Sequence, residues 1–414
     1  MSKRVVVTGL GMVSPLGLSV EESWEGLLAA RSGIGLVEDF PTDGFPTRIV
    51  AQAKAFQVDN YLDRRESRRM ARFAQLAVAA AAEALRQAGL NLEREDRTRV
   101  GLQIGAAIGG LPVIEEQSLI LQRDGARRIN PTFVPTVIVS AGACQLAVLW
   151  GIRGPAGAPA AACATGVVAL GEALRWLQRG DADVVLAGGT ESAITPLALA
   201  AFSRLGALST RNEDPEHACR PFDAVRDGTV MGEGAAILVM ETAEHAYRRN
   251  ASILAEVAGY ALTEDGFHAT APEPTGDGAA RAMALAIKDA GLGPEEIGYI
   301  VPHGTGTPLN DVSESRAIHR VFGERARRIP VSSNKGGIGH TLGAAGAISA
   351  VIGIKAMLEN LLPPTANLDT PDPECDLDHV RLRPRPVRVD SVLVNAFGFG
   401  GQNACLVLKR CQGG

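Results

Sequence analysis

The sequence predicts an α/β fold in which helices cover a buried, mostly parallel sheet. Three observations support this fold class. The composition is 46% hydrophobic and only 4% aromatic, with 47 glycines, which suits closely packed α/β layers better than an aromatic-rich β-sandwich. Short β-branched runs recur along the chain, and several of them end in small or glycine-rich loops. Helical patterns rich in Ala and Leu separate these runs, as expected for a sheet that is covered on both faces.

The predicted elements fall into two sets of similar order. The first apolar runs lie at 4–11, 99–110, 182–192 and 234–242, and the second at 253–262, 297–308, 329–340 and 391–410. The clearest helical patterns lie at 69–88, 166–179, 279–290 and 343–359. This repetition predicts an internal duplication with halves at residues 1–250 and 251–414. No linker or low-complexity stretch separates the halves, so we expect them to share one packed body.

Composition and charge exclude several classes of protein. A formal net charge of −5 argues against a nucleic-acid-binding surface. The six cysteines are widely scattered without CxxC spacing, which argues against a zinc or redox-dithiol site and fits free thiols in a reducing compartment. The first apolar run reaches glycine too soon for a signal peptide, and no apolar segment looks long and unbroken enough to span a bilayer. We therefore expect a cytoplasmic protein with no metal and no membrane association.

A single thiol stands among small residues in "AACATG". Cys163 directly precedes an apolar periodic helix that stops at Gly180. At a helix N-terminus, unpaired N–H groups and the helix dipole favour the thiolate, and the small neighbours leave room for a substrate. On this stretch alone a buried core cysteine is the slightly favoured alternative, because that is the commoner role of a free thiol.

Three further glycine-rich loops follow apolar strands. His303 lies in "HGTGTP", at the carboxyl end of a strand, where α/β sheets build their sites. Lys335 and His340 share "NKGGIGHTLGAAG", where a neutral His340 could donate a hydrogen bond to an anionic transition state. "NAFGFGGQN" predicts a tight turn whose N–H groups point into a site. Each loop has a structural alternative, but together they indicate nucleophilic catalysis by groups from distant parts of the chain.

These four motifs, in this order and spacing, resemble those of the decarboxylating Cys-His-His β-ketoacyl-acyl-carrier-protein synthases, and synthase II most closely. The resemblance runs from "RVVVTGLGMVSPLG" to the last strand. It implies the thiolase fold, in which duplicated halves form a five-layered αβαβα sandwich, normally as a homodimer.

The resemblance also implies catalytic roles. Cys163 would accept the acyl chain, while His303 and His340 would bind the malonyl thioester carbonyl and stabilise the enolate. Lys335 would support the His340 side of the site. Backbone N–H groups of Cys163 and Phe399 would form an oxyanion hole, and Phe399 would gate the acyl pocket.

Substrate-binding roles follow in the same way. Thr305 and Thr307 would hydrogen-bond the phosphopantetheine arm. Ile108 and Phe133 fall where the family lines its acyl tunnel, Phe133 across the dimer interface. From their position after His303, we expect Asp311 and Glu314 to order that loop without needing to touch substrate.

The implied partner is acyl carrier protein, which brings the malonyl and acyl thioesters on its own phosphopantetheine, so no resident cofactor is expected. Arg65 and Arg69 lie in "DRRESRRMAR", which resembles the basic patch that docks this acidic partner. A solvated helix face is an equally good interpretation of these charges. A homodimer is expected, and a heterodimer with a ketosynthase-like partner is the alternative.

The implied reaction is decarboxylative Claisen condensation of an acyl chain with malonyl-acyl carrier protein in fatty acid elongation. Four departures from the family pattern bear on the pathway: Gly306, Asn334, Ala396 and Gln402 stand where Ser, Thr, Ser and Thr are typical. "HGTGT" and "IGHT" are more like polyketide synthases, so a discrete type II ketosynthase of polyketide or polyene biosynthesis is the alternative.

Three other classes are disfavoured. A catalytically dead chain-length-factor subunit would lack the nucleophile, which is present here as Cys163. A biosynthetic thiolase would carry a second cysteine where this chain has "FGFGG". A non-decarboxylating starter synthase would have Asn at the position of His340.

Overall fold

A computed structural model describes residues 3–411, and within that range the largest sheet has eleven strands. Its order is β12-β10-β9-β14-β15-β8-β1-β7-β6-β4-β5. The strands of the first part of the chain are β1 (Val5–Val13), β4 (Val100–Gly105), β5 (Ala156–Gly157), β6 (Val184–Glu191) and β7 (Gly234–Thr242). Those of the second part are β8 (Ala255–Glu264), β9 (Tyr299–Val301), β10 (Pro330–Val331), β12 (Asp378–His379), β14 (Ser391–Gly398) and β15 (Gln402–Lys409).

The strand order repeats, which confirms the predicted duplication. Counting only the strands of the main sheet and leaving out β12, the first half has the order β5-β4-β6-β7-β1 and the second has β10-β9-β14-β15-β8. In both halves this is the third, second, fourth, fifth and first strand along the chain. The halves join where Val6 and Val7 of β1 pair with Glu256 and Ala255 of β8. The predicted division after residue 250 falls between α9 and β8.

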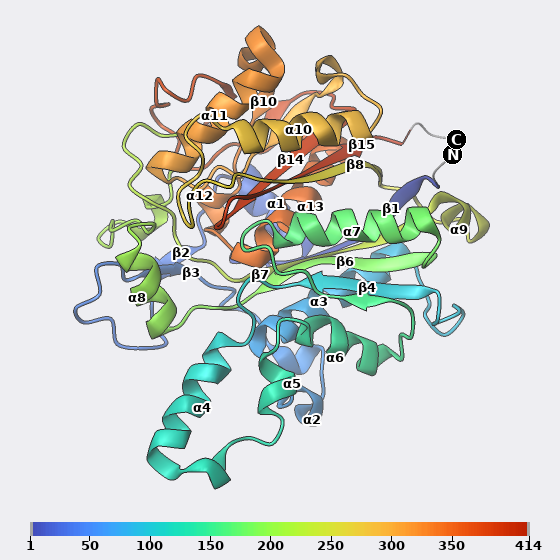
Figure 1. Ribbon diagram of the computed structural model, residues 1–414, viewed down its shortest axis with the longest axis vertical. Helices are drawn as coiled ribbons and strands as arrows, with labels where there is room; N and C mark the ends of the chain where they lie inside the picture. The colour runs from blue at the N-terminus through green and yellow to red at the C-terminus, as the bar shows by residue number, and fades with distance from the viewer. Residues whose placement is uncertain (1–2, 412–414) are drawn as a thin grey trace.

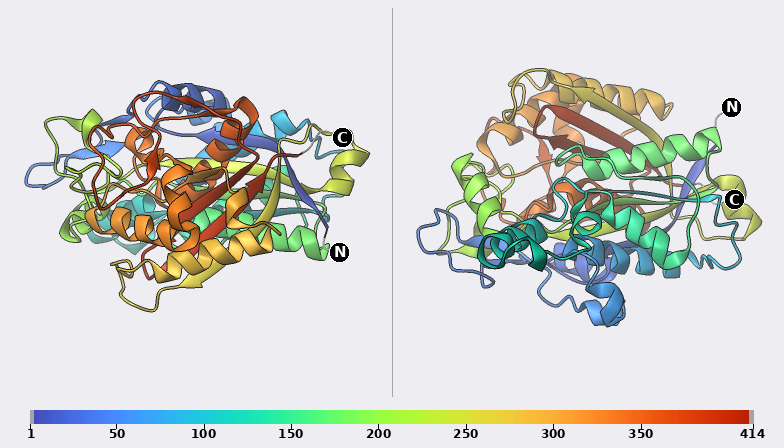
Figure 2. Two further views of the ribbon diagram at one scale, coloured as in Figure 1. Left: turned by 90° about the horizontal axis from the view of Figure 1, so that it is seen from above. Right: turned by 60° about the horizontal axis from the view of Figure 1, so that its bottom comes forward.

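The helices and the two halves of the sheet form five layers (Figure 1). Helices α7 (Thr165–Arg179) and α13 (Ala345–Glu359) lie in the middle and contact strands of both halves. Helix α3 (Arg72–Ala88) covers the outer face of β1 and β7. On the opposite side, α10 (Asp277–Asp289) and α11 (Pro308–Phe322) cover the second half (Figure 2). The predicted αβαβα sandwich is therefore confirmed.

The remaining elements decorate this body, and α4 projects from it in Figure 1. The other helices are α1 (Val20–Leu28), α2 (Arg64–Ser67), α4 (Leu111–Asp124), α5 (Phe133–Val137), α6 (Ala141–Trp150), α8 (Pro196–Arg204), α9 (Ala243–Arg248) and α12 (Lys335–Ile338). Two small ribbons pair β2 (Ile34–Leu36) with β3 (Ile49–Ala51) and β11 (Leu361–Leu362) with β13 (Arg385–Pro386).

Strand direction differs from the prediction, because the sheet is mixed rather than mostly parallel. Strand β4 is parallel to β5 and β6, and β9 is parallel to β10 and β14. However, β7 is antiparallel to β6 and β1, and β15 is antiparallel to β14 and β8. These antiparallel central strands are as buried as the parallel strands. Their apolar sequences therefore do not indicate in which direction they run.

One apolar segment is longer than the sequence analysis led us to expect, since no run there looked long enough to span a bilayer. Within the described part of the chain, Leu342–Glu359 is long and apolar enough, by length and composition, to cross a membrane. It includes α13, and 83% of the segment is buried inside the protein. A helix enclosed between two sheets has to be apolar on every side, which accounts for its composition.

The two central helices approach each other through glycines. A Cβ atom at Gly166 of α7 would lie 2.5 Å from the backbone N of Ala347 in α13. A Cβ atom at Gly346 of α13 would lie 2.8 Å from the backbone N of Val167 in α7. The helix backbones are therefore closer than any side chain would allow. Because α7 begins just after Cys163 and α13 begins five residues after His340, this contact brings both residues to one place.

We predict that Gly166→Ala lowers the free energy of unfolding by about 1–3 kcal/mol, the usual cost of overpacking, despite the better helix propensity of Ala. Denaturant unfolding measures the change. Gly142→Ala in α6 is the matched control, since its Cβ would meet its nearest neighbour at 3.6 Å, an ordinary contact. The control should be neutral or stabilising. Equal stability of the Gly166→Ala variant and the parent would contradict the proposed close contact.

Candidate active site

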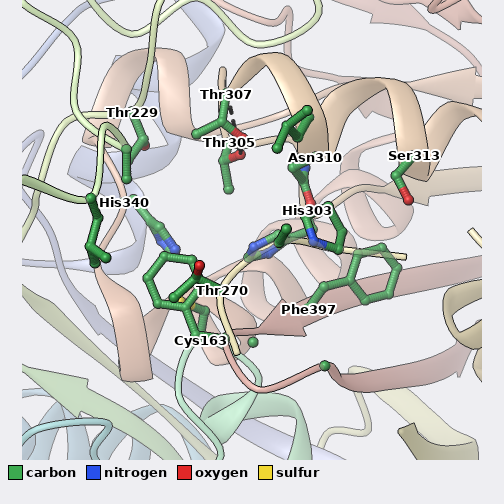
Figure 3. A pocket seen from close by; sticks show the side chains of 18 of the residues that line it. Cys163, Thr229, Thr270, His303, Thr305, Thr307, Asn310, Ser313, His340 and Phe397 are labelled. Carbon is green, nitrogen blue, oxygen red and sulfur yellow. Dashed lines mark hydrogen bonds between the residues drawn. The ribbon is translucent and has the colours of Figure 1, made fainter. Parts of the chain in front are cut away.

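The motifs from both halves of the chain line one cavity of about 270 Å³. Its walls include Cys163 from the start of α7, His303 from the loop after β9 and His340 from the turn before α13. Phe397 of the β14–β15 hairpin also lines the cavity (Figure 3), as does Phe399 of the same hairpin. Lys335 is buried directly behind the cavity. The structure therefore brings together the residues that the sequence motifs singled out as catalytic.

A strained turn presents the Cys163 thiol. The preceding residue, Ala162, has φ of 45°, in the left-handed region that residues with a Cβ rarely adopt. The Thr165 hydroxyl holds this turn, since it accepts a hydrogen bond from the Ala161 N–H and donates one to the Ala162 carbonyl. Such strain is characteristic of functional sites, where the surrounding structure holds the backbone in place. Here it places the sulfur at the base of the cavity.

Burial governs the charge of the thiol. The Cys163 side chain is almost fully enclosed, which raises its pKa to about 12, although the positive charge of Lys335 opposes the rise. The helix N-terminus was expected to favour the thiolate, but burial outweighs that effect here, and the thiol form dominates at neutral pH. Desolvation outweighs the dipole because the sulfur is enclosed in an apolar cluster that includes Met231 and Leu342.

Two backbone N–H groups lie near this sulfur. Burial dominates the pKa of the thiol, but the nearby N–H groups of Phe399 and of Cys163 itself lower it. This is the pair predicted to form an oxyanion hole. The carbonyl oxygen of an acyl group attached to the sulfur would lie close to both donors. The Phe399 ring stacks on Phe202 of α8, with centroids 6.2 Å apart. Phe399 thus lies against Cys163 through its backbone and against a second aromatic ring through its side chain.

The two histidines face the same space. Their ring centroids are 5.3 Å apart and the ring planes are nearly perpendicular, at 80°. Burial, followed by the positive charge of Lys335, holds the pKa of His303 and of His340 well below the ordinary histidine value. Both imidazoles are therefore neutral at neutral pH, as expected for His340. Each neutral ring retains one N–H to donate, and within residues 3–411 the Nδ1 atom of each has no partner.

Charged groups on both sides hold the His303 backbone. Glu314 accepts hydrogen bonds from the N–H groups of His303, at 2.8 Å, and Gly304, at 2.7 Å. On the other side, the Lys335 ammonium donates to the His303 carbonyl. The predicted contact of Lys335 with the His340 side is replaced by this bond to His303. Lys335 still affects both rings, because its charge lowers the pKa of each.

The rest of the loop after His303 is tied down in the same manner. Asp311 accepts hydrogen bonds from the N–H groups of Thr305, at 3.0 Å, and Gly306, at 3.1 Å. Together with the Glu314 contacts, this confirms that the two carboxylates order the loop. The Thr305 and Thr307 hydroxyls, 2.8 Å apart, line the cavity above the histidines (Figure 3). They lie where a polar arm reaching Cys163 would pass.

The other predicted residues lie outside the cavity. Ile108 does not line it but packs in the same apolar cluster as Cys163. Phe133 begins α5 and is half-buried, while Arg65 and Arg69 are exposed in and just after α2. The roles assigned to these four side chains remain predictions.

Sequence reasoning missed two residues close to the site. Phe202 was not singled out because it lies in α8, which carries none of the recognised motifs. Glu191 ends the buried strand β6 and contacts two loops of the site. The available signal was an acidic residue at the end of a strand-like run with no other charge, in "VVLAGGTE".

Comparisons with known proteins agree with this geometry. The chain matches the family models "Beta-ketoacyl synthase, N-terminal domain" over residues 2–246 and "Beta-ketoacyl synthase, C-terminal domain" over residues 254–369. It is 47% identical over 410 residues to 3-oxoacyl-[acyl-carrier-protein] synthase 2 of Synechocystis sp., covering 99% of both chains. The synthase 2 of Coxiella burnetii is 44% identical over 408 residues, again with 99% coverage of both.

Solved structures are similar over the whole chain. A β-ketoacyl synthase from Burkholderia phymatum superposes with a TM-score of 0.92 at 38% identity, covering 99% of this chain and 100% of that one. The ishigamide ketosynthase/chain length factor superposes at 0.91 with 35% identity, and a type II polyketide synthase ketosynthase in complex with its acyl-carrier protein at 0.91 with 34%; each match covers both chains fully. The chain thus belongs to the β-ketoacyl synthase family and has the thiolase fold of its ketosynthases.

Proposed function

We propose that this enzyme condenses an acyl chain, carried on Cys163, with malonyl-acyl carrier protein. The products are β-ketoacyl-acyl carrier protein and CO2, and the pathway is fatty acid elongation. The observation that carries the proposal is the convergence of two backbone N–H donors and two neutral imidazoles around one buried thiol. Relatives that are 44–47% identical over 99% of this chain, named 3-oxoacyl-[acyl-carrier-protein] synthase 2, support it.

The first step is transfer of the acyl chain to Cys163. The sulfur forms a bond to the acyl carbonyl carbon, and the bond from that carbon to the pantetheine sulfur breaks. The proton of the buried thiol passes to the departing sulfur. Negative charge that develops on the carbonyl oxygen is stabilised by the N–H groups of Cys163 and Phe399, which are already aimed at this position.

The second step needs a carbanion, which loss of CO2 supplies without a strong base. As the carboxylate of the malonyl group leaves, its electron pair moves into an enolate whose charge lies on the thioester oxygen. His303 and His340 donate hydrogen bonds to this oxygen, and they can do so because both rings are neutral. The enolate carbon then attacks the carbonyl carbon of the Cys163 thioester, the bond from that carbon to sulfur breaks, and the sulfur regains a proton from water.

Lys335 contributes through position rather than by transferring a proton. Its ammonium holds the His303 carbonyl. Burial is the main reason why both imidazoles stay unprotonated, and the charge of Lys335 adds to it. Burial lowers the pKa of Lys335, and the neighbouring Glu314 carboxylate opposes this by favouring the charged form.

Acyl carrier protein is the proposed partner, and the enzyme is proposed to act in the cytoplasm as a homodimer without a resident cofactor. One solved relative is a type II polyketide synthase acyl-carrier protein in complex with its ketosynthase, which supports this kind of partner. Exposed apolar side chains on α4, α5 and α6, including Leu119, Val134 and Val148, support burial of this face by a second copy. In that dimer, Phe133 would line the acyl pocket of the other protomer.

A discrete polyketide or polyene ketosynthase is the second candidate, because one of the similar structures is a type II polyketide synthase acyl-carrier protein in complex with its ketosynthase. We predict that saturated acyl-acyl-carrier-protein primers are condensed at least as well as enoyl or β-keto primers. Initial rates with the three primer classes, at equal malonyl-acyl carrier protein, measure this preference. Exclusive use of unsaturated or keto primers would contradict the fatty acid proposal and support the alternative.

Replacing the nucleophile should separate the two half-reactions. We predict that Cys163→Gln lowers condensation at least about 1,000-fold, because no thioester can form, while decarboxylation of malonyl-acyl carrier protein continues. Release of labelled CO2 and formation of β-ketoacyl product are measured in parallel. Cys144→Ser, which removes an exposed thiol outside the cavity, should retain both activities. Normal condensation by Cys163→Gln would show that another group carries the acyl chain.

Replacing a donor to the enolate should have the opposite effect. We predict that His303→Ala lowers CO2 release by about 100- to 1,000-fold, the usual loss for one such donor, while iodoacetamide still modifies Cys163. The labelled peptide is quantified by mass spectrometry beside the CO2 assay. His217→Ala, at an exposed histidine that does not line the cavity, is the control and should change neither result. Unaltered CO2 release by His303→Ala would remove this residue from the mechanism.

A further inference from the structure

Glu191 ends β6 as a fully buried carboxylate that makes no ion pair with any described residue. Its oxygens accept hydrogen bonds from the backbone N–H groups of two separate segments. From the segment after β4, the donors are Ala107 at 2.7 Å, Ile108 at 3.3 Å and Gly109 at 3.0 Å. From the turn before α13, the donor is Gly343 at 3.3 Å. One side chain therefore ties these two segments together.

Both segments border the apolar space beside the nucleophile. Ile108 and Leu342 belong to the same apolar cluster as Cys163. Leu342 lies two residues after His340, lines the cavity and has φ of 46°, a left-handed conformation that is costly for leucine. The Gly343 N–H bonded to Glu191 immediately follows this strained residue. The carboxylate thus joins a wall of the apolar cluster to the turn that carries a catalytic histidine.

An acyl chain on Cys163 has to enter this cluster, because it is the apolar surrounding of the sulfur. The cavity that reaches Cys163 is lined by Phe202, Met231 and Leu342, but it does not extend to Ile108. A short chain fits within the cavity as it stands. A longer chain has to push into the cluster toward Ile108. The rigidity of the segment that carries Ile108 therefore affects the binding of long chains more than that of short ones.

We propose that Glu191 is a positioning residue that sets the acyl-chain-length preference by holding the Ala107–Gly109 segment against the turn after His340. The inference rests on the proposed function, since only a condensing enzyme loads acyl chains of different length onto Cys163. Glu191 acts through the two segments and does not itself line the cavity.

The number and type of donors make a carboxylate necessary. Four N–H groups point at the two oxygens, and every hydrogen bond needs an acceptor. A glutamine of the same shape would turn an NH2 group toward at least one of these donors, and two donors cannot bond to each other. Glu191→Gln should therefore release one of the segments without changing the volume of the side chain.

The chain offers a matched control in Glu233. It is also a buried glutamate, but its contacts are with Arg72, the Ser192 hydroxyl and the Ala53 N–H. None of these partners belongs to the segments that Glu191 holds. Glu233→Gln therefore tests whether loss of a buried carboxylate near the site is by itself enough to alter the preference.

The experiment compares kcat/KM for tetradecanoyl- and hexanoyl-acyl-carrier-protein primers in the parent enzyme, Glu191→Gln and Glu233→Gln. In Glu191→Gln we expect the long-to-short ratio to rise at least about fivefold, the effect of losing one hydrogen bond. The rate of iodoacetamide modification of Cys163 should stay within about threefold of the parent, since the thiol keeps its own N–H donors. In Glu233→Gln the long-to-short ratio should equal that of the parent.

Several outcomes would overturn the proposal. An unchanged ratio in Glu191→Gln, or an equal loss with both primers, would leave Glu191 a purely structural residue. An equal change of ratio in Glu233→Gln would show that the effect is not specific. If Glu191→Gln does not fold, Glu191→Asp is the variant that tests the proposal, because it keeps the charge but has a shorter side chain. Its long-to-short ratio of kcat/KM must also rise above that of the parent. A parent enzyme that condenses neither primer would overturn the proposed function itself, a result distinct from an unchanged ratio.

Discussion

Helices α7 and α13 come from different halves of the chain and touch backbone to backbone in the middle layer, at Gly166 and Gly346. The position of this contact decides where the reacting groups lie. Cys163 precedes the first turn of α7, and His340 lies in the turn that leads into α13. Side chains at the two glycines would separate the helices and move the thiol away from the imidazole. The αβαβα arrangement thus brings Cys163, the proposed nucleophile from one half, to His340, a proposed hydrogen-bond donor from the other.

Buried charges then fix the loops around this point. Glu191, Asp311 and Glu314 each accept hydrogen bonds from two or more backbone N–H groups, and Lys335 donates to a backbone carbonyl. Such charges are costly to bury, and the cost is offset only where the geometry satisfies them. Burial raises the pKa of Glu191 and of Glu314 to about 7. The result is a set of rigid loops that surround neutral imidazoles and a neutral thiol, a suitable environment for stabilising negative charge only when it develops.

The sequence predicted the position of the elements better than their direction. Apolar runs located the main strands, and the repeated order indicated the duplication. Strand direction was predicted wrongly because strands buried on both faces look alike in sequence, whichever way they run. The ionisation of Cys163 could not be judged from sequence either, because a local pattern shows the helix N-terminus that favours the thiolate but not the desolvation that tertiary packing imposes. The contact of Lys335 with the His303 carbonyl and the ties made by Glu191 join residues far apart in the chain, so no local pattern reports them.

The central claim is that the N–H groups of Cys163 and Phe399 form one anion site and the two imidazoles form another, on either side of the same sulfur. A crystal structure of the enzyme acylated on Cys163 tests this most directly. The account predicts that the thioester oxygen accepts hydrogen bonds from both N–H groups, at about 2.7–3.1 Å, and leaves the imidazoles free for the malonyl group. A thioester oxygen bonded to His303 or His340 instead, with the Phe399 N–H turned away, would contradict it.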